Sequence, residues 1–143
     1  MSPLPRSLTL ELVTPDKAIV HEVVDEVQLP GWSGALGILP GHTPMLAMLK
    51  PGELWYRKGE EKTYFVLDTG MAEVLPDKVT VLVRLADKPQ DIDVIKQEAD
   101  RLAAEGELRS AVTAEDAERA RVAMLTAMVK LRAAERIRMK KGI

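Results

Sequence analysis

The sequence predicts a two-part α+β fold. An N-terminal antiparallel β-sandwich or barrel spans residues 1–88, and a C-terminal antiparallel hairpin of two helices spans residues 89–143. In the first part, apolar residues alternate with polar ones in short runs that Pro, Gly and Asp separate. After residue 87 the apolar spacing changes from two to about 3.6, and no Gly or Pro follows Pro89 until Gly106. This change of period marks the predicted domain boundary.

The predicted strands follow from the alternation. Leu8, Leu10 and Leu12 alternate with polar residues, which is typical of a strand with one buried face. The last run repeats the pattern, with these residues expected to face the core: Val79, Val81, Val83 and Leu85. The strands between them are predicted at residues 23–29, 45–49, 53–57, 63–67 and 71–75.

Two of these predictions carry detail about side chains. The run over residues 23–29 is interpreted as one strand, with Val23, Val27 and Leu29 on one face and Val24 on the other. The runs 53–57 and 63–67 flank Lys58-Gly59-Glu60-Glu61, a composition typical of a hairpin turn. Cross-strand contacts in that hairpin are predicted among four aromatic residues: Trp55, Tyr56, Tyr64 and Phe65.

The densest turn signal is the stretch GALGILPGHTPML over residues 34–46. Glycine permits backbone angles that a Cβ forbids and proline fixes φ, so Gly37 and the pair Pro40-Gly41 predict forced bends. Apolar residues fill the gaps, which places the bends against a core. The stretch therefore predicts a corner of the β structure, with His42 in a turn.

Two helices are predicted after the boundary. Asp91 is placed to cap the first, Gly106 is expected to end it, and its apolar face is predicted to contain Ile92, Ile95, Ala99 and Leu102. Thr113-Ala114-Glu115-Asp116 resembles a capping box that opens a longer helix running to Lys141. The stripe of this second helix is rich in alanine: Ala117, Ala120, Met124, Ala127 or Met128, Leu131 and Ala134. Little large apolar area is buried per turn, so weak docking of the two helices is expected.

Composition narrows the possible functions. The chain has no Cys, so it offers no disulfide, thiolate metal site or Cys nucleophile. Its two histidines, His21 and His42, have no carboxylates clustered at ligand spacing, and we expect no metal site. A net charge of -2 argues against general nucleic-acid binding. Without a signal-like apolar segment or a run of about 20 apolar residues, we expect a soluble protein that is not exported by its own signal.

One hypothesis drawn from the residues is a small hydrolase that uses His42 with Asp68, because a loop histidine titrates near neutral pH. No partnered nucleophile supports this hypothesis, and the simpler interpretation of His42 is a turn residue with a local hydrogen bond. The glycines near residues 31–37 follow a strand but open no helix, and GxxxxGK[ST] is missing. The sequence therefore contains no phosphate loop.

Cations gather at the end of the second helix, against a single Glu135: Lys130, Arg132, Arg136, Arg138, Lys140 and Lys141. Cations at a helix C-terminus are favoured by the macrodipole, so this end is either a solvated helix terminus or a basic hook for an acidic protein. Nucleic acid is a third alternative, with less support because no aromatic or glycine-rich element accompanies the charge.

The corner sequence LGI-x-PGH-x-P, followed by two apolar residues, resembles the signature of the ε subunit of the bacterial F-type ATP synthase. The resemblance extends to the Lys50-Pro51-Gly52 turn, the Leu-Asp-Thr-Gly segment at residues 67–70, and a C-terminal helical hairpin opened by Ile92-Asp93. It covers nearly the whole chain. It implies a non-catalytic subunit, so no enzyme activity and no cofactor are expected.

In that family the β-sandwich binds the foot of the γ shaft and rests on the c-ring, coupling proton-driven rotation to the catalytic head of α and β subunits. The resemblance implies rotor contact at Trp32, Leu39 and His42. It also implies a regulatory hairpin that lies folded, or extends along γ and blocks ATP hydrolysis. The residues that would then contact an acidic segment of a β subunit are Arg132, Arg136, Arg138, Lys140 and Lys141. The implied location is the cytoplasmic face of the bacterial plasma membrane, with membrane association only through the complex.

Some members of the family bind ATP in the folded hairpin through an Ile/Leu-Asp-x-x-Arg-Ala motif and later arginines. Here Ile92 and Asp93 are followed by Lys96-Gln97, Lys130 stands at the last arginine position, and the two positions between hold Ala103 and Thr126. Lysine lacks the bidentate fork of arginine, so we expect ATP to bind weakly or not at all. The alternative to the whole assignment is a free-standing β-sandwich adaptor whose helical hairpin binds another protein.

Overall fold

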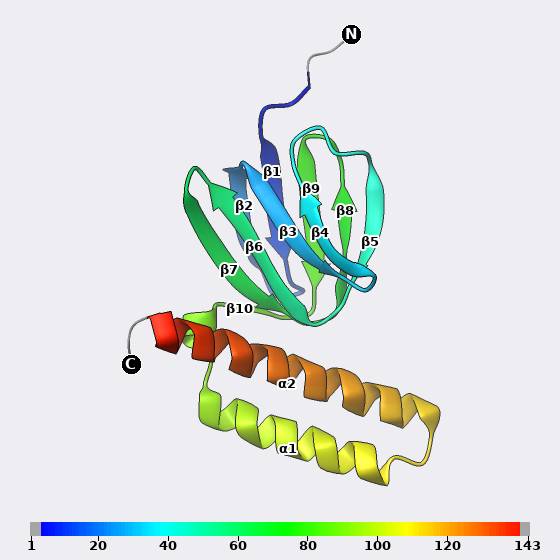
Figure 1. The fold of residues 1–143 in the computed structure, drawn as a ribbon. Helices are drawn as coiled ribbons and strands as arrows, with labels where there is room; N and C mark the ends of the chain where they lie inside the picture. Colours follow the sequence, from blue (N-terminus) through cyan, green and yellow to red (C-terminus); the bar gives the residue numbers. More distant parts are fainter. Residues whose placement is uncertain (1–3, 141–143) are drawn as a thin grey trace. The chain divides into compact units, whose positions relative to one another are not determined.

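The structure, a computed structural model, describes residues 4–140. The chain divides into two compact units between Ala86 and Asp87. The first unit is a nearly closed β-sandwich and the second is a pair of antiparallel helices (Figure 1). The predicted fold class is therefore confirmed.

The described residues form one ten-stranded sheet that curls into the sandwich. Its strands are β1 (Leu8–Val13), β2 (Ala18–Val24), β3 (Glu26–Gly31), β4 (Gly34–Ile38), β5 (Met45–Leu49), β6 (Gly52–Lys58), β7 (Glu61–Leu67), β8 (Gly70–Val74), β9 (Lys78–Val83) and β10 (Ala86–Asp87). They are joined in the order β10-β7-β6-β3-β5-β8-β9-β1-β2, and β4 pairs with β3 beside this path. The first strand, β1, pairs in parallel with the late strand β9.

The core is built by the alternation seen in the sequence. The leucines of β1 (Leu8, Leu10 and Leu12) are fully buried, and the inward valines of β9 are buried as well. Leu85 departs from the prediction, because β9 ends at Val83 and about half of the Leu85 side chain is exposed. Buried side chains from all the longer strands join these residues in one apolar cluster.

The prediction of one strand over residues 23–29 is wrong. The chain bends at Asp25, which separates β2 from β3, and the backbone N–H of Asp25 donates to the Arg57 carbonyl at 2.8 Å. The break reverses the alternation, so Val24 and Val27 both face the core while Val23 is exposed. The Asp25 carboxylate accepts the Gly59 N–H at 2.7 Å, which ties the break to the β6–β7 turn.

The predicted hairpin is confirmed as β6 and β7, joined at a turn where Gly59 has a φ of +61°. Of the four aromatic residues, Trp55 lies opposite Tyr64 on the outer face, and the Lys62 ammonium lies 4.2 Å from the centre of the Trp55 ring. The inward residues instead face non-aromatic partners across the hairpin: Tyr56 opposite Thr63, and Phe65 opposite Leu54.

The GALGILPGHTPML stretch contains a strand as well as a corner. Residues 34–38 form β4, and Gly37 lies within that strand with open space where a Cβ would stand, so its prediction as a forced bend is wrong. The bend comes later, at Pro40-Gly41, where Gly41 has a φ of +87° that favours glycine. The Gly41 N–H donates to the Pro76 carbonyl at 2.7 Å and fastens the corner to the β8–β9 turn.

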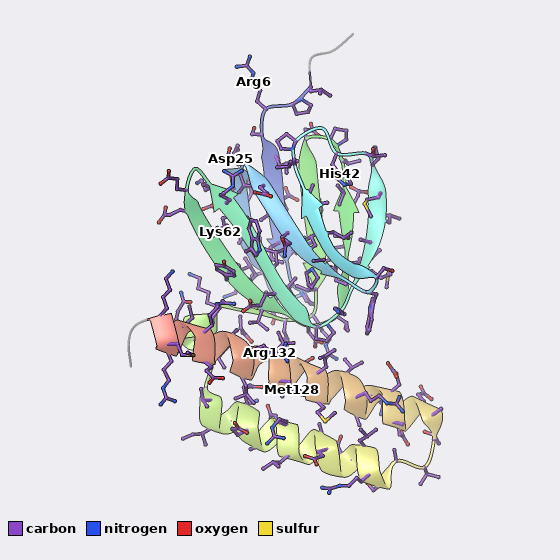
Figure 2. All side chains as sticks on the ribbon, in the orientation of Figure 1. Arg6, Asp25, His42, Lys62, Met128 and Arg132 are labelled. Carbon is purple, nitrogen blue, oxygen red and sulfur yellow. The ribbon has the colours of Figure 1, made fainter. Side chains whose placement is uncertain are left out.

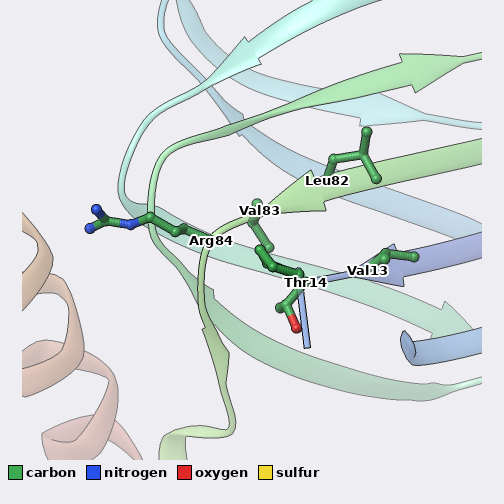
Figure 3. Close-up of a pocket in the computed structure, with 6 residues that line it drawn as sticks. Val13, Thr14, Leu82, Val83 and Arg84 are labelled. Carbon is green, nitrogen blue, oxygen red and sulfur yellow. The ribbon is translucent and has the colours of Figure 1, made fainter. Parts of the chain in front are cut away.

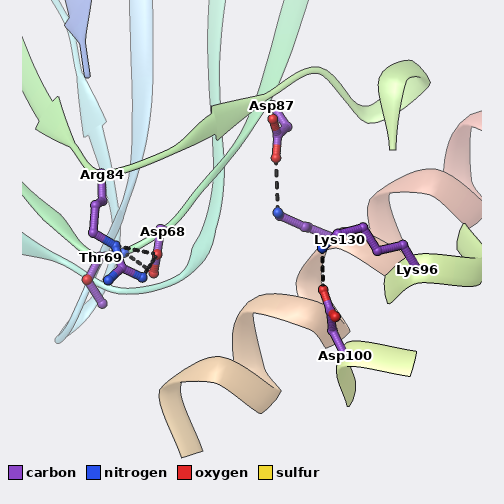
Figure 4. A network of polar contacts seen from close by, with 7 residues as sticks. All are labelled: Asp68, Thr69, Arg84, Asp87, Lys96, Asp100 and Lys130. Atoms are coloured by element: carbon purple, nitrogen blue, oxygen red, sulfur yellow. Dashed lines mark hydrogen bonds and ion pairs between the residues drawn. The ribbon is translucent and has the colours of Figure 1, made fainter. Parts of the chain in front are cut away.

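A buried carboxylate anchors the segment between β7 and β8. Asp68 is 3 % exposed and accepts the Thr69 N–H at 2.7 Å (Figure 4). The Arg84 guanidinium donates two hydrogen bonds to the same carboxylate, at 2.6 and 3.2 Å. A buried charge needs such compensation, so Asp68 and Arg84 act as a structural pair in the sandwich.

Tyr56 gives the sandwich a testable pH dependence. Burial raises the pKa of the Tyr56 phenol above its usual value of 10.0, because the charged phenolate is poorly solvated inside the protein. The unfolded chain therefore releases this proton at a lower pH than the folded chain does, and stability is lost as pH rises above about 10. Denaturant titrations between pH 8 and 11 should show a smaller alkaline loss for Tyr56→Phe than for the wild type. Tyr64→Phe, on the opposite face of the same hairpin, controls for the loss of a phenol, and equal losses in both variants would contradict the assignment.

The helical unit begins with the short 3₁₀ turn η1 (Pro89–Asp91), followed by α1 (Val94–Ser110) and α2 (Ala114–Lys140). The cap of α1 is Asp93, whose carboxylate accepts the Lys96 N–H at 3.1 Å, so the prediction of Asp91 was two residues early. Gly106 does not end α1, because it keeps helical geometry and the helix continues for four more residues. The predicted cap of α2 is confirmed by the hydrogen bond from the Asp116 N–H to Thr113 Oγ1 at 3.0 Å.

The two helices pack against each other in an antiparallel arrangement (Figure 1), and most of their buried residues are small. In α2 the buried residues are Ala120, Ala127, Val129 and Ala133. In α1 they are Gln97 and Ala104, which are spaced by two helical turns. The predicted apolar face of α1 is therefore wrong: Ile95 is 84 % exposed and Leu102 is 57 % exposed.

Candidate functional site

The loop between β4 and β5 brings two of the predicted rotor-contact residues together. The His42 N–H donates to the Leu39 carbonyl at 3.1 Å and closes a turn, and more than half of the Leu39 side chain is exposed. His42 Nδ1 donates to the Thr43 carbonyl at 2.8 Å (Figure 2). The loop thus presents an apolar side chain beside a locally bonded histidine.

Trp32 lies at the other end of β4, in the tight turn that joins it to β3. Five residues of strand separate it from Leu39, a span of roughly 15 Å. The Trp32 N–H donates to the Met48 carbonyl at 3.1 Å, which holds this turn against β5. The structure therefore divides the three residues between two places on the sandwich.

An exposed apolar surface accompanies Trp32. Met48 of β5, Met71 of β8 and Leu82 of β9 are neighbours across three strands and point outward, with Met48 62 % exposed. Together with Trp32 they line an open pocket of about 340 Å³. We call these four residues the methionine face. Trp and Met are enriched where proteins bind one another, and an exposed apolar patch of this kind favours a protein-binding surface.

A second pocket adjoins the methionine face and shares Leu82. It has a volume of about 390 Å³ and is lined mainly by Val13, Thr14, Pro15, Val83 and the stem of Arg84 (Figure 3). The methionine face was not predicted from the sequence. The sequence did contain an indication of it, because the outward positions of two half-buried strands hold Met48 and Leu82 where polar residues are usual.

The structure does not join the two residues, His42 and Asp68, that the hydrolase hypothesis requires. Among the described residues no hydrogen bond joins His42 to Asp68, since His42 Nδ1 bonds the Thr43 carbonyl and Asp68 bonds Arg84 and Thr69. Within residues 4–140 no group of three or more His, Cys, Asp or Glu side chains is arranged to hold a metal ion.

The basic end of α2 is exposed. Arg132, Arg136 and Lys140 are spaced by four residues and therefore share one side of the helix, whereas the spacing of Arg138 places it on another side. Within residues 4–140 no acidic side chain forms an ion pair with Arg132, Arg138 or Lys140. Lys141 lies outside the described residues. This end of the helix is thus a concentration of positive charge that is accessible to a partner.

The residues at the degenerate nucleotide motif have internal partners. Asp93 caps α1, Lys96 Nζ lies 2.7 Å from Asp100, and Lys130 Nζ lies 3.0 Å from Asp87 (Figure 4). The hydrogen bond to Asp100 is the main cause of a raised pKa at Lys96, and Asp93 and Asp87 add to it through their charge. Ile92, the first residue of the motif, is half-buried. Each candidate cation is therefore already neutralised by a carboxylate.

Mg-ATP should bind the isolated chain at millimolar concentration or not at all. Ala103 offers no donor, and the Thr126 hydroxyl donates to the Val122 carbonyl of its own helix at 2.9 Å. Loss of two charge-assisted contacts, at roughly 1.5 to 3 kcal/mol each, moves even a micromolar site to millimolar. Calorimetric titration with Mg-ATP measures this directly. Saturable binding in the micromolar range would contradict the argument from donors.

Taken together, the fold and its exposed surfaces define a small β-sandwich protein with a helical hairpin, whose candidate sites are surfaces for other proteins. No helix in residues 4–140 combines the length and the apolar character that crossing a membrane requires.

Comparison with known proteins gives the particular family. Residues 7–89 match the family model described as the β-sandwich domain of the ATP synthase delta/epsilon chain. An ATP synthase epsilon chain of Syntrophobacter fumaroxidans is 42% identical over 90% of this chain and 96% of its own length. The chain therefore belongs to the family of ATP synthase epsilon chains.

Solved structures agree with this fold. A chain in the mitochondrial ATP synthase of Euglena gracilis has a TM-score of 0.80 at 24% identity, covering 93% of this chain and 84% of that one. A chain in the central stalk and c-ring structure of the Tetrahymena thermophila mitochondrial ATP synthase has a TM-score of 0.67 at 18% identity, covering 93% and 99%. Both matches include most of the hairpin as well as the sandwich, since each covers 93% of this chain.

Proposed function

We propose that the chain is a non-catalytic central-stalk subunit of a proton-translocating F-type ATP synthase. In this role the sandwich couples rotation of the c-ring and γ to the catalytic head, and the hairpin inhibits ATP hydrolysis. The observation that carries the proposal is the match to an epsilon chain over 90% of this chain, which takes in both units.

The sandwich supplies the rotor contacts in this proposal. Trp32 and Leu39 are large apolar side chains held in exposed turns, and His42 lies beside Leu39. The methionine face extends the apolar surface around Trp32 over three strands. An apolar surface of this kind suits a lasting contact with γ, because the buried core of an interface is depleted in charge.

The hairpin supplies the regulation. Its helices pack through alanines and bury few large side chains, so separating them costs little apolar burial. Its basic end, Arg132 to Lys140 with Lys141 beyond, suits an acidic segment of a β subunit. Nucleotide control of the hairpin is not part of the proposal, because the candidate cations are internally paired.

The partners in this proposal are γ, the c-ring, and the α and β subunits, with no nucleic acid. The chain reaches the membrane only through the complex, as a peripheral subunit at the cytoplasmic face of the bacterial plasma membrane. A free-standing adaptor role finds no support in the relatives, which are named as ATP synthase chains.

Reconstitution tests the proposal. ATP hydrolysis by α, β and γ subunits is measured alone, with the full chain, and with a fragment ending at Lys88. We expect the full chain to bind γ and lower the hydrolysis rate, and the fragment to bind γ without lowering it. Failure of both forms to bind γ would contradict the sandwich role. Equal inhibition by both forms would contradict the role of the hairpin.

A further inference from the structure

An ion pair joins the first residue of the helical unit to its second helix, α2. Asp87 immediately precedes the turn that leads into η1, and Lys130 lies in the second half of α2. The Lys130 Nζ is 3.0 Å from Asp87 Oδ2, although 43 residues (130 minus 87) separate them in sequence (Figure 4). The α2 helix also packs against η1, where Pro89 is buried. The pair therefore exists only while α2 is folded back to the start of the unit.

The Lys130 side chain is largely buried, so its charge depends on the ion pair with Asp87. The Lys130 side chain is 12 % exposed, whereas that of Asp87 is 44 % exposed. An ammonium group shielded from water depends on a partner to remain charged without penalty. Removal of Asp87 would leave the Lys130 charge shielded and unpaired, while removal of both charges would leave no such defect.

A second ion pair nearby provides a natural comparison. Lys96 and Asp100 are four residues apart in α1, their side chains are both well exposed, and Nζ lies 2.7 Å from Oδ2. Because both residues belong to one helix, this pair persists wherever α2 goes. Of the two pairs, only Asp87–Lys130 depends on closure of the hairpin.

We propose that Asp87 and Lys130 form a clasp that holds α2 against the start of the helical unit without any bound ligand. Opening of the hairpin must break this clasp, so the balance between closed and open hairpins depends on an internal ion pair. The clasp concerns packing within the helical unit and does not require that the hairpin inhibits hydrolysis.

Hydrogen exchange of the full-length chain, measured by mass spectrometry on peptides from α2, tests the clasp. Asp87→Asn should raise the exchange rate of these peptides about tenfold, the effect of losing about 1.4 kcal/mol. The matched control Asp100→Asn breaks the exposed pair within α1 and should leave exchange in α2 unchanged. Equal effects of the two variants would overturn the proposal.

A double-variant cycle separates the clasp from general damage to the helix. Lys130→Met in the Asp87→Asn background removes the unpaired charge, so exchange in α2 should return toward the wild-type rate. Purely additive effects of the two changes would overturn the proposal. Mg-ATP should leave exchange in the wild type unchanged, and a slowing of exchange by Mg-ATP would contradict a ligand-independent clasp. Reconstituted hydrolysis is a separate measurement, so failure of the clasp and failure of the inhibitory role can be told apart.

Discussion

Replacing Gly70 by Ala should destabilise the sandwich by about 3 kcal/mol or more, a large fraction of the roughly 5–15 kcal/mol that stabilises a typical domain. Gly70 opens β8 and lies between Leu49 of β5 and Val83 of β9. A Cβ at this position would overlap the Leu82 carbonyl oxygen and the Val83 backbone. These atoms belong to a paired strand inside the sheet, so they cannot move aside without breaking its hydrogen bonds.

The matched control for Gly70→Ala is Gly37→Ala. Gly37 also lies in a strand, its φ is not positive, and nothing stands within 4 Å of the position that a Cβ would take. We expect its free energy of unfolding to change by less than about 1 kcal/mol, with a small gain from the loss of glycine entropy. Urea denaturation followed by circular dichroism measures both variants. Similar midpoints for the two would show that close strand approach at Gly70 is not the controlling feature.

Neutralising the basic end of α2 should relieve inhibition of ATP hydrolysis in the reconstituted complex. Four cations are changed together to Gln: Arg132, Arg136, Arg138 and Lys140. Exposed ion pairs contribute about 0.2 to 1 kcal/mol each, so a single change has little effect while four together weaken the contact about tenfold or more. The expected result is a higher steady-state hydrolysis rate with unchanged binding to γ.

The control for the basic end removes the same charge elsewhere in the hairpin. Arg101 lies midway along α1, and Arg109, Arg119 and Arg121 lie nearer the α1–α2 turn. Arg101, Arg119 and Arg121 form ion pairs with acids of their own helix. Changing these four to Gln should leave inhibition in place. Equal relief by both sets would point to net charge, and no relief by either would leave the basic end as a solvated helix terminus. Circular dichroism checks that α2 stays helical, since its last turn loses charges that the helix dipole favours.

The sequence predicted the strands well wherever alternation alone decides burial, as in Leu8, Leu10 and Leu12. The prediction of a single strand was wrong at Asp25. A one-residue break there reverses the face of every following residue, and the local alternation of apolar residues does not reveal such a break. At this break the Asp25 carboxylate accepts a hydrogen bond from the Gly59 N–H in the distant β6–β7 turn, and such a tertiary contact is invisible in a window of residues.

The prediction of the buried face of α1 was wrong for a different reason. Ile95 and Leu102 form a plausible apolar stripe, but the close approach of two helices favours the small side chain of Ala104. Periodicity gives the angle between residues and does not say which side meets a partner. The same limit hid the methionine face, whose residues could be recognised as outward only once the strand register was known.

The parallel pairing of β1 with β9 affects how the protein folds during its synthesis on the ribosome. Thr9 pairs with Lys78, 69 residues later (78 minus 9), so β1 is synthesised well before the strand β9 with which it pairs. Contacts this distant in sequence form slowly, because the intervening chain must be ordered before they are made. Until then the leucines of β1 are exposed on the nascent chain, whereas α1 and α2 need only each other's short segment to meet. The sandwich thus closes only after β9 has been synthesised.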